Sequence, residues 1–197
     1  LEFRRVLFRS AASLRHRVQI NEGLTSGDPE ALLSGLEARI HLSFARQPFD
    51  PRSLELLNKT NQFNLNGRHW EESEFRAFLA DPHSLLAIVS YEDRFGALGK
   101  IAVAAGVKRG EELHLKSWVM SCRAFSRRIE FSTLQALFEH AGTATIRLDW
   151  QATARNNPIR QTLEALCSPV PYSGALSLTR EGFERSCPTL YAAVSLN

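Results

Sequence analysis

Three consecutive β-strand segments limit the folds open to this chain more than any other feature of its sequence. Apolar runs predict strands at Leu85 to Tyr91, Lys100 to Val107 and Leu113 to Ser121. Turn-forming residues lie between the first two, at Asp93 to Gly96 and at Gly99, and predict a hairpin there. We therefore expect an antiparallel sheet in the middle of the chain.

Helical segments flank these strands on both sides in the sequence. Asp28-Pro29 and Asp50-Pro51 each place a capping residue before a proline, which predicts helices running to about Arg39 and Thr60. The remaining pattern predicts helices at 71–80, 125–141 and 157–166, and strands at 40–44, 145–150, about 175–178 and 189–195. The fold class expected is α/β (α+β), with a mixed central sheet and helices on both faces.

Charge, cysteine and histidine content exclude several classes of function. The 197 residues carry 24 Lys and Arg against 21 Asp and Glu, a net charge of +3, which is too small to indicate nucleic acid as a partner. No stretch approaches the roughly 20 apolar residues that span a bilayer, so no membrane partner is expected. Three cysteines without close pairs favour a reducing, cytoplasmic location, and singly scattered histidines predict no metal site.

Four sequence strings carry a resemblance to a known family. They are NKTNQFN at 58–64, DRFG at 93–96, MSCR at 120–123 and TARNNP at 153–158. In this order they resemble the C-terminal domain of FkbH-like (HAD-IIIC type) proteins, over about residues 28 to 167. The order of the predicted elements is also similar to the GNAT acyltransferase fold. The resemblance therefore implies a GNAT-like acyltransferase domain.

FkbH-like proteins join a HAD-type phosphatase domain to the GNAT-like domain and make glyceryl thioesters on acyl carrier proteins for polyketide-type pathways. The resemblance implies that this chain moves a glyceryl-type group through a cysteine thioester to such a carrier. The phosphatase half needs an Asp-x-Asp-x-Thr motif, and this sequence contains no Asp-x-Asp. The phosphatase activity and its Mg²⁺ are therefore assigned to a missing N-terminal HAD-type domain, which is the second expected partner. No tightly bound cofactor is expected, only the carrier's phosphopantetheine arm.

The division of the chain follows from this resemblance. Residues 1–10, LEFRRVLFRS, resemble a translated sequencing adapter and are treated as an artefact outside the fold. Residues 11–39 are expected to be a remnant of the missing upstream domain or a linker helix. Residues 40–197 are expected to form the GNAT-like domain.

Cys122 is the main catalytic candidate. It ends a predicted strand just before a helix, where the helix dipole and Arg123, Arg127 and Arg128 can stabilise a thiolate. A thiolate there can hold an acyl group as a thioester. The alternative is a small buried residue at a strand end. Cys167 and Cys187 lack such a setting and are interpreted as structural.

The same three arginines, with Asn156, are the candidates for binding the phosphopantetheine arm. The family usually has glycine on both sides of the arginine at position 127, where this chain has Ser126 and Arg128. Side chains there crowd a place where backbone should approach the ligand. The alternatives are an exposed basic helix start for the arginines and helix N-capping for Asn156.

The loop that contains NQFN is the candidate substrate site. The amides of Asn61, Gln62 and Asn64 can hydrogen-bond the hydroxyls of a small acyl group. Arg68 can bind a phosphate or a carboxylate, and His69 can act as the general base that activates a thiol. The alternatives are an Asn-rich turn and a histidine without a catalytic role.

Two other functions remain open from the sequence. Loss of the two glycines is compatible with a catalytically degenerate module that only docks a carrier protein. An ordinary acetyl-CoA-dependent GNAT N-acetyltransferase is the third possibility, and it predicts saturable binding of acetyl-CoA, which the other two do not.

Overall fold

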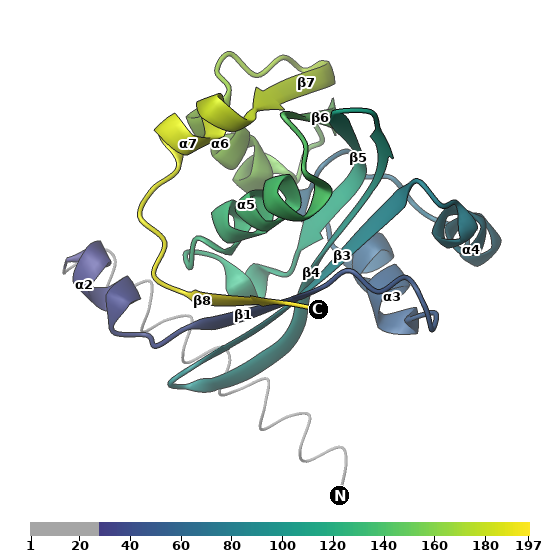
Figure 1. Cartoon of the computed structure of the whole chain (residues 1–197). Coiled ribbons are helices and arrows are strands. Elements are labelled where there is room, and N and C mark those ends of the chain that lie inside the picture. The colour runs from purple at the N-terminus through teal and green to yellow at the C-terminus, as the bar shows by residue number, and fades with distance from the viewer. Residues whose placement is uncertain (1–27) are drawn as a thin grey trace, which may run out of the picture.

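One mixed sheet organises residues 28–197, which are the part of the chain that the computed structural model describes (Figure 1). The sheet has eight strands in the order β7-β6-β5-β4-β3-β1-β8, and β2 pairs with β5 outside this path. The strands are β1 Arg39–Ser43, β2 Phe63–Asn64, β3 Ser84–Asp93, β4 Gly96–Arg109, β5 Glu112–Met120, β6 Thr145–Gln151, β7 Ser173–Thr179 and β8 Ala193–Leu196. The helices are α2 Pro29–Ser34, α3 Pro51–Lys59, α4 Glu72–Ala80, α5 Ile129–Ala141, α6 Asn157–Leu166 and α7 Arg180–Ser186, with a 3₁₀ turn at Cys122–Ala124.

The middle of the sheet is antiparallel, as predicted. The pairs β1–β3, β3–β4, β4–β5 and β6–β7 are antiparallel, whereas β5–β6 and β1–β8 are parallel. Asp93 closes the β3–β4 hairpin opposite Gly96, and its carboxylate accepts a hydrogen bond from the backbone N–H of Phe95 (2.9 Å). Gly99 lies within β4 opposite Tyr91, next to a shift in register, and so is not part of the turn.

Helices cover both faces of the sheet, which confirms the predicted architecture. Helices α5, α6 and α7 lie on one face, and α3 and α4 lie on the other (Figure 1). The larger buried cluster includes Trp118 and Phe138, and the second is built around Trp70 and Phe75. The predicted order of elements is observed, with β2 and α7 as additional elements.

Several predicted boundaries are wrong, for local reasons. The helix that begins after Asp28 ends at Ser34, because the chain turns at Gly35 and Glu37 adopts a positive φ of 52° before β1. The segment predicted as a helix from Phe125 is non-helical until Ile129. Helix α7 was not predicted; the hydroxyl of Thr179 caps it by accepting from the N–H of Gly182 (3.0 Å).

Residues 1–27 lie outside the described part of the chain, so the adapter-like segment and most of the expected remnant at 11–39 are not tested. Within residues 28–197, no helix is both long enough and apolar enough to cross a bilayer. No group of three or more His, Cys, Asp or Glu side chains that could hold a metal ion occurs in these residues.

Candidate functional site

The structure brings Cys122 together with two of the predicted substrate-binding amides. They line one pocket of about 660 Å³. Its lining residues come from the end of α3, from the end of β5 and from the loop before α6: Lys59, Thr60, Asn61, Gln62, Met120, Ser121, Cys122 and Arg155. Two strings that lie about sixty positions apart in the sequence thus share one cavity.

Strand β2 is the reason why these segments meet. Phe63 pairs with Met120 and Asn64 with Val119, so the loop that contains Asn61 lies beside the end of β5. Phe63 is buried and packs edge-on against Trp118, with ring centroids 5.1 Å apart. An aromatic pair of this kind adds stability beyond that of the buried area. Asn61 itself is exposed.

Cys122 is half-buried and is the first residue of a single 3₁₀ turn. Helix α5 begins only at Ile129, so the predicted position directly before an α-helix N-terminus is wrong. Arg123 directly follows Cys122 in the sequence. Its Nε donates to the hydroxyl of Ser121 (3.3 Å), and it has no carboxylate partner among the described residues. The environment of the thiol is therefore polar and carries one adjacent unpaired cation.

The other two cysteines are in different surroundings. Burial raises the pKa of both the Cys167 and the Cys187 thiols. Each sulfur lies within hydrogen-bond distance of a backbone carbonyl, that of Leu163 (3.3 Å) and that of Pro188 (3.4 Å) respectively. A neutral thiol that donates to a carbonyl agrees with the structural interpretation of both residues.

Arg127 is not free to bind a phosphate, which corrects the prediction. Its side chain is 2% exposed and forms an ion pair with Asp93 (Nε to Oδ2, 3.5 Å). Its Nη1 donates to the carbonyls of Arg123 (2.9 Å) and Phe125 (3.2 Å). Arg127 therefore fixes the loop that follows Cys122 from inside the protein.

Arg128 is also engaged elsewhere. Its guanidinium forms an ion pair with Glu30 at the start of α2 and donates to the carbonyl of Thr189 (2.7 Å). It joins the first described helix to the C-terminal segment. This contact occupies the side chain that the sequence assigned to the phosphopantetheine arm.

The two positions where the family usually has glycine share one backbone property. Ser126 has φ 65° and Arg128 has φ 59°, both in the left-handed region that favours glycine. The loop therefore keeps a glycine-type backbone without glycine. Ser126 is exposed, so its side chain does not fill the interior of the loop.

Asn156 lies at the N-cap position of α6 but does not cap the helix with its side chain, which corrects the capping interpretation. It is buried, and no hydrogen bond caps α6 from its side chain. Its amide donates to the carbonyls of Asn64 and Gln151 (2.9 Å each) and accepts from the N–H of Thr153 (2.7 Å). All three contacts are internal, so Asn156 holds the segments around the pocket in place.

Asn64 is likewise structural. It is buried, and its amide donates to the carbonyl of Thr60 (2.8 Å). Its side-chain oxygen accepts from the N–H groups of Asn66 (3.2 Å) and Gly67 (2.8 Å), which forms a local turn. Of the three amides predicted to bind substrate, only Asn61 and Gln62 reach the pocket.

The segment that follows β2 fills the space where β5 and β6 diverge. These parallel strands pair only from Glu112 opposite Thr145 to Leu115 opposite Leu148. Beyond that point the N–H of Leu65 donates to the carbonyl of Trp118 (2.9 Å), and the N–H of Gln151 donates to the carbonyl of Leu65 (3.2 Å). The edge of β5 that β6 leaves unpaired is thus covered by residues 63–65.

Asn66 completes this closure. Its amide nitrogen donates to the carbonyls of both Lys116 and Asp149 (2.9 Å each), one on each diverging strand. A ligand that needed these backbone groups would have to displace residues 63–66 from the gap.

Arg68 and His69 lie outside the Cys122 pocket. Arg68 forms an ion pair with Glu74, and its guanidinium lies 3.9 Å from the centroid of the Trp70 ring. His69 is exposed. The structure therefore does not bring the predicted general base to the thiol.

Arg155 lines the pocket but is not among the site residues predicted from the sequence. It is exposed, and its guanidinium has no ion pair or hydrogen-bond partner among the described residues. It lies in the TARNNP string that carries the resemblance, in which Asn156 is the residue predicted to bind the pantetheine arm. Lys59 also lines the pocket, although it is paired with Glu55 (3.0 Å).

Comparison of the sequence with models of protein families found no match, and comparison with curated proteins found none either. Among solved structures, the chain resembles the ribosomal-protein-S18-alanine N-acetyltransferase from Escherichia coli, with 14% identity, a TM-score of 0.44, and coverage of 71% of this chain and 90% of that one. The IAA acetyltransferase from Bacillus cereus is 14% identical, with a TM-score of 0.43 and coverage of 65% of this chain and 75% of that one. A variant spermidine N-acetyltransferase from Vibrio cholerae is 14% identical, with a TM-score of 0.45 and coverage of 76% of this chain and 98% of that one. These likenesses are distant, so functional roles are assigned from the chain's own side chains.

Proposed function

We propose that this chain is an acyltransferase domain of the FkbH-like type. It accepts a glyceryl-type hydroxyacyl group as a thioester on Cys122 and delivers it to the phosphopantetheine thiol of an acyl carrier protein. The observation that supports this most directly is the shared pocket of Cys122 with Asn61 and Gln62. A nucleophile and two hydroxyl-binding amides are the groups such a transfer needs.

The reaction is a thioester exchange in two similar steps. The Cys122 thiolate attacks the carbonyl carbon of the donor thioester, a new C–S bond forms, and the donor C–S bond breaks. The donor thiolate leaves and takes up a proton equivalent to the one that Cys122 released. The carrier's pantetheine thiolate then attacks the acyl-cysteine in the same way. Because a thioester is exchanged for a thioester, no external energy source is required.

The pocket walls suit a small polar acyl group. The side chains of Asn61 and Gln62 are exposed and make no hydrogen bonds with other described residues, so both are free to donate to and accept from hydroxyl groups. A volume of about 660 Å³ has room for a three-carbon acyl group and the end of a pantetheine arm.

The charge around the opening suits an acidic carrier protein. Arg155 lines the pocket and Arg123 follows Cys122, and neither forms an ion pair among the described residues. Unpaired cations beside a binding site accelerate encounter with an acidic partner and orient it. Arg123 and Arg155 are therefore the candidate docking residues, whereas Arg127 and Arg128 are engaged with Asp93 and Glu30.

Intact-protein mass spectrometry tests the proposal. The full chain is incubated with a glyceryl-loaded carrier protein, beside Cys122→Ala and the matched control Cys167→Ala. We expect one glyceryl adduct on the wild type and on Cys167→Ala, none on Cys122→Ala, and its release by neutral hydroxylamine, which cleaves thioesters.

The other outcomes separate the remaining functions. Carrier binding without any adduct supports the docking module instead. Saturable binding of acetyl-CoA, with no adduct from the loaded carrier, supports an N-acetyltransferase. An adduct that persists in Cys122→Ala shows that another group carries the acyl chain.

A further inference from the structure

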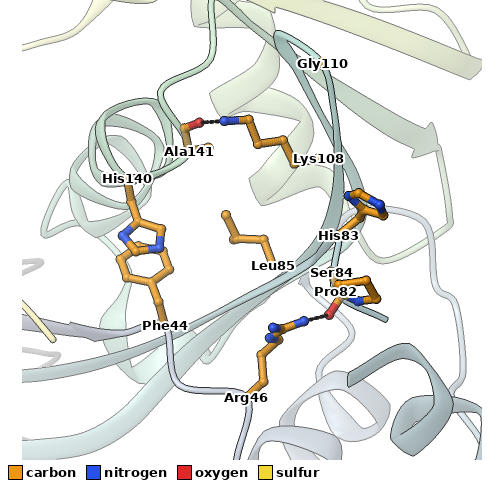
Figure 2. Close-up of a pocket in the computed structure, with 10 residues that line it drawn as sticks. All are labelled: Phe44, Arg46, Pro82, His83, Ser84, Leu85, Lys108, Gly110, His140 and Ala141. Atoms are coloured by element: carbon orange, nitrogen blue, oxygen red, sulfur yellow. Dashed lines mark hydrogen bonds between the residues drawn. The ribbon is translucent and has the colours of Figure 1, made fainter. Parts of the chain in front are cut away.

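A second pocket lies at the other end of β5 from Cys122. Figure 2 shows the side chains that line it. Its volume is about 470 Å³. It is lined by the segment after β1, the start of β3, the end of β4 and the C-terminus of α5: Phe44, Arg46, Pro82, His83, Ser84, Leu85, Lys108, Gly110, His140 and Ala141. No acidic side chain is among these residues.

The two pockets are far apart. Gly110, just before β5, lines this second pocket, and Met120, at the end of β5, lines the Cys122 pocket. Strand residues advance about 3.3 Å each, so these two positions lie on the order of 30 Å apart. The second pocket is therefore not an extension of the proposed acyl-transfer site.

Two cations in the pocket lack a carboxylate partner. Nη1 of Arg46 donates to the carbonyl of Asp81 and to the hydroxyl of Ser84 (3.1 Å). The ammonium group of Lys108 donates to the carbonyl of Ala141 at the end of α5. Each contact uses only part of the donor capacity, because a guanidinium has five N–H groups and an ammonium group has three.

Other lysines and arginines of the described residues do have carboxylate partners. Lys100 of β4 pairs with Asp50 (2.7 Å), and Lys116 of β5 pairs with Asp149 (3.0 Å). The charges of Arg46 and Lys108 are thus left uncompensated around one cavity.

Two histidines add further hydrogen-bonding groups. Figure 2 shows His83, Lys108, Arg46 and His140 placed around the cavity, with Leu85 between them. The His140 ring stacks flat on Phe44, with centroids 3.6 Å apart and an interplanar angle of 2°, which fixes its orientation. Burial lowers the pKa of His140. A neutral imidazole keeps one N–H that can donate a hydrogen bond to an oxyanion.

We propose that this pocket binds a small anion that carries two or more phosphoryl groups. The planar fork of a guanidinium matches two phosphate oxygens, and an ammonium group adds a compact charge. Lys108 also neutralises the C-terminal end of α5, whose partial negative charge would otherwise oppose an anion. The cavity is large enough for a diphosphate and a small attached group.

A calorimetric titration of the full chain with pyrophosphate tests this site. It is done at about 0.15 M salt, which screens non-specific attraction. We expect saturable one-site binding in the wild type, and at least tenfold weaker binding in Arg46→Gln and in Lys108→Gln. The matched control is Arg109→Gln, which removes the same charge from the next residue of β4 outside the pocket. Its affinity should equal that of the wild type.

Citrate replaces pyrophosphate in a second arm, because it is a polyanion without phosphorus. Weaker binding of citrate is expected; equal binding overturns the phosphoryl assignment. Absence of saturation in the wild type, or an equal loss in Arg109→Gln, overturns the site. Because Lys108 also caps α5, Arg46→Gln decides the result if Lys108→Gln does not fold. The adduct on Cys122 is measured separately and does not depend on either result.

Discussion

Asp93 and Arg127 form an ion pair inside the protein, with their side chains 3% and 2% exposed. Asp93 lies at the β3–β4 hairpin, and Arg127 lies in the loop between Cys122 and α5. The hydroxyl of Tyr91 donates to the same carboxylate oxygen (3.0 Å), and burial raises the pKa of that hydroxyl. One buried carboxylate thus connects the hairpin to the loop that follows the candidate nucleophile.

Removal of one member of this pair should destabilise the fold strongly. Arg127→Met leaves the Asp93 carboxylate buried without its counter-charge, and we expect a loss of about 3–5 kcal/mol in the free energy of unfolding. The double variant Asp93→Asn, Arg127→Met removes both charges and should lose less than Arg127→Met alone. Urea unfolding measures all of these. If the stability lost in the double variant equals the sum of the losses in Asp93→Asn and in Arg127→Met, the two residues do not interact.

Asn156 should matter for stability far more than its neighbour. Asn156→Ala removes the side-chain partner of the Asn64 carbonyl, the Gln151 carbonyl and the Thr153 N–H, each costing about 1–3 kcal/mol unless water reaches it. We expect a total loss of at least about 2 kcal/mol. Asn157→Ala, at the exposed next position, is the control and should change stability little. Equal effects from the two changes would restore the helix-capping interpretation.

The pocket geometry separates two residues that the sequence placed in one site. Asn61 lines the Cys122 pocket and His69 does not. Asn61→Ala should slow glyceryl adduct formation about fivefold, the effect of losing one hydrogen bond of about 1 kcal/mol. His69→Ala should leave the rate unchanged. A large loss in His69→Ala, with folding intact, would bring back the histidine as a general base.

The contact of Glu30 with Arg128 and Tyr191 should make stability depend on pH in the acid range. Hydrogen bonds from Arg128 and from Tyr191 lower the pKa of Glu30 from 4.5 to about 2. Because the pKa is lower in the folded state, this contribution is complete above about pH 4.5 and is lost as the pH falls towards 2. The wild type should therefore exceed Glu30→Gln in thermal midpoint at pH 6, and the difference should disappear near pH 2.

Glu184→Gln is the control for that comparison. Glu184 is an exposed glutamate without an ion pair among the described residues. The thermal midpoint of Glu184→Gln should therefore equal that of the wild type at every pH. A difference between Glu30→Gln and the wild type that stays constant down to pH 2 would contradict the assignment.

Most of the fold could be predicted from local sequence signals. Alternating and continuous apolar runs identified β3, β4, β5 and β6, and Asp-Pro pairs located the starts of α2 and α3. These signals are local, because a strand or a helix start depends on a few consecutive residues. The short strand β2 gave no such signal, since two residues form a strand only when a partner edge is available.

The site was predicted less completely, because its composition depends on contacts between distant segments. Cys122 and Asn61 were identified from strings, and the structure places them in one pocket. Sequence alone could not show that Arg127 points inward to Asp93, or that Asn156 bonds to Asn64. Exposure and pairing of a polar side chain follow from the packed structure, which is why Arg155, and not Asn156, is the residue of its string that lines the pocket.

Ser126 offers a test of the glycine-type backbone in the loop after Cys122. A residue with a side chain in the left-handed region costs about 1–2 kcal/mol relative to glycine. Ser126 is exposed, and its side chain makes no hydrogen bond with other described residues that a change would remove. Glycine also gains freedom in the unfolded chain, which offsets about 0.5–1 kcal/mol. Ser126→Gly should therefore raise the free energy of unfolding slightly, by up to about 1 kcal/mol, whereas Ser126→Ala, which keeps the Cβ atom, should not. Chemical denaturation of both variants decides the matter: a loss of stability in Ser126→Gly would mean that the loop does not hold this residue at positive φ.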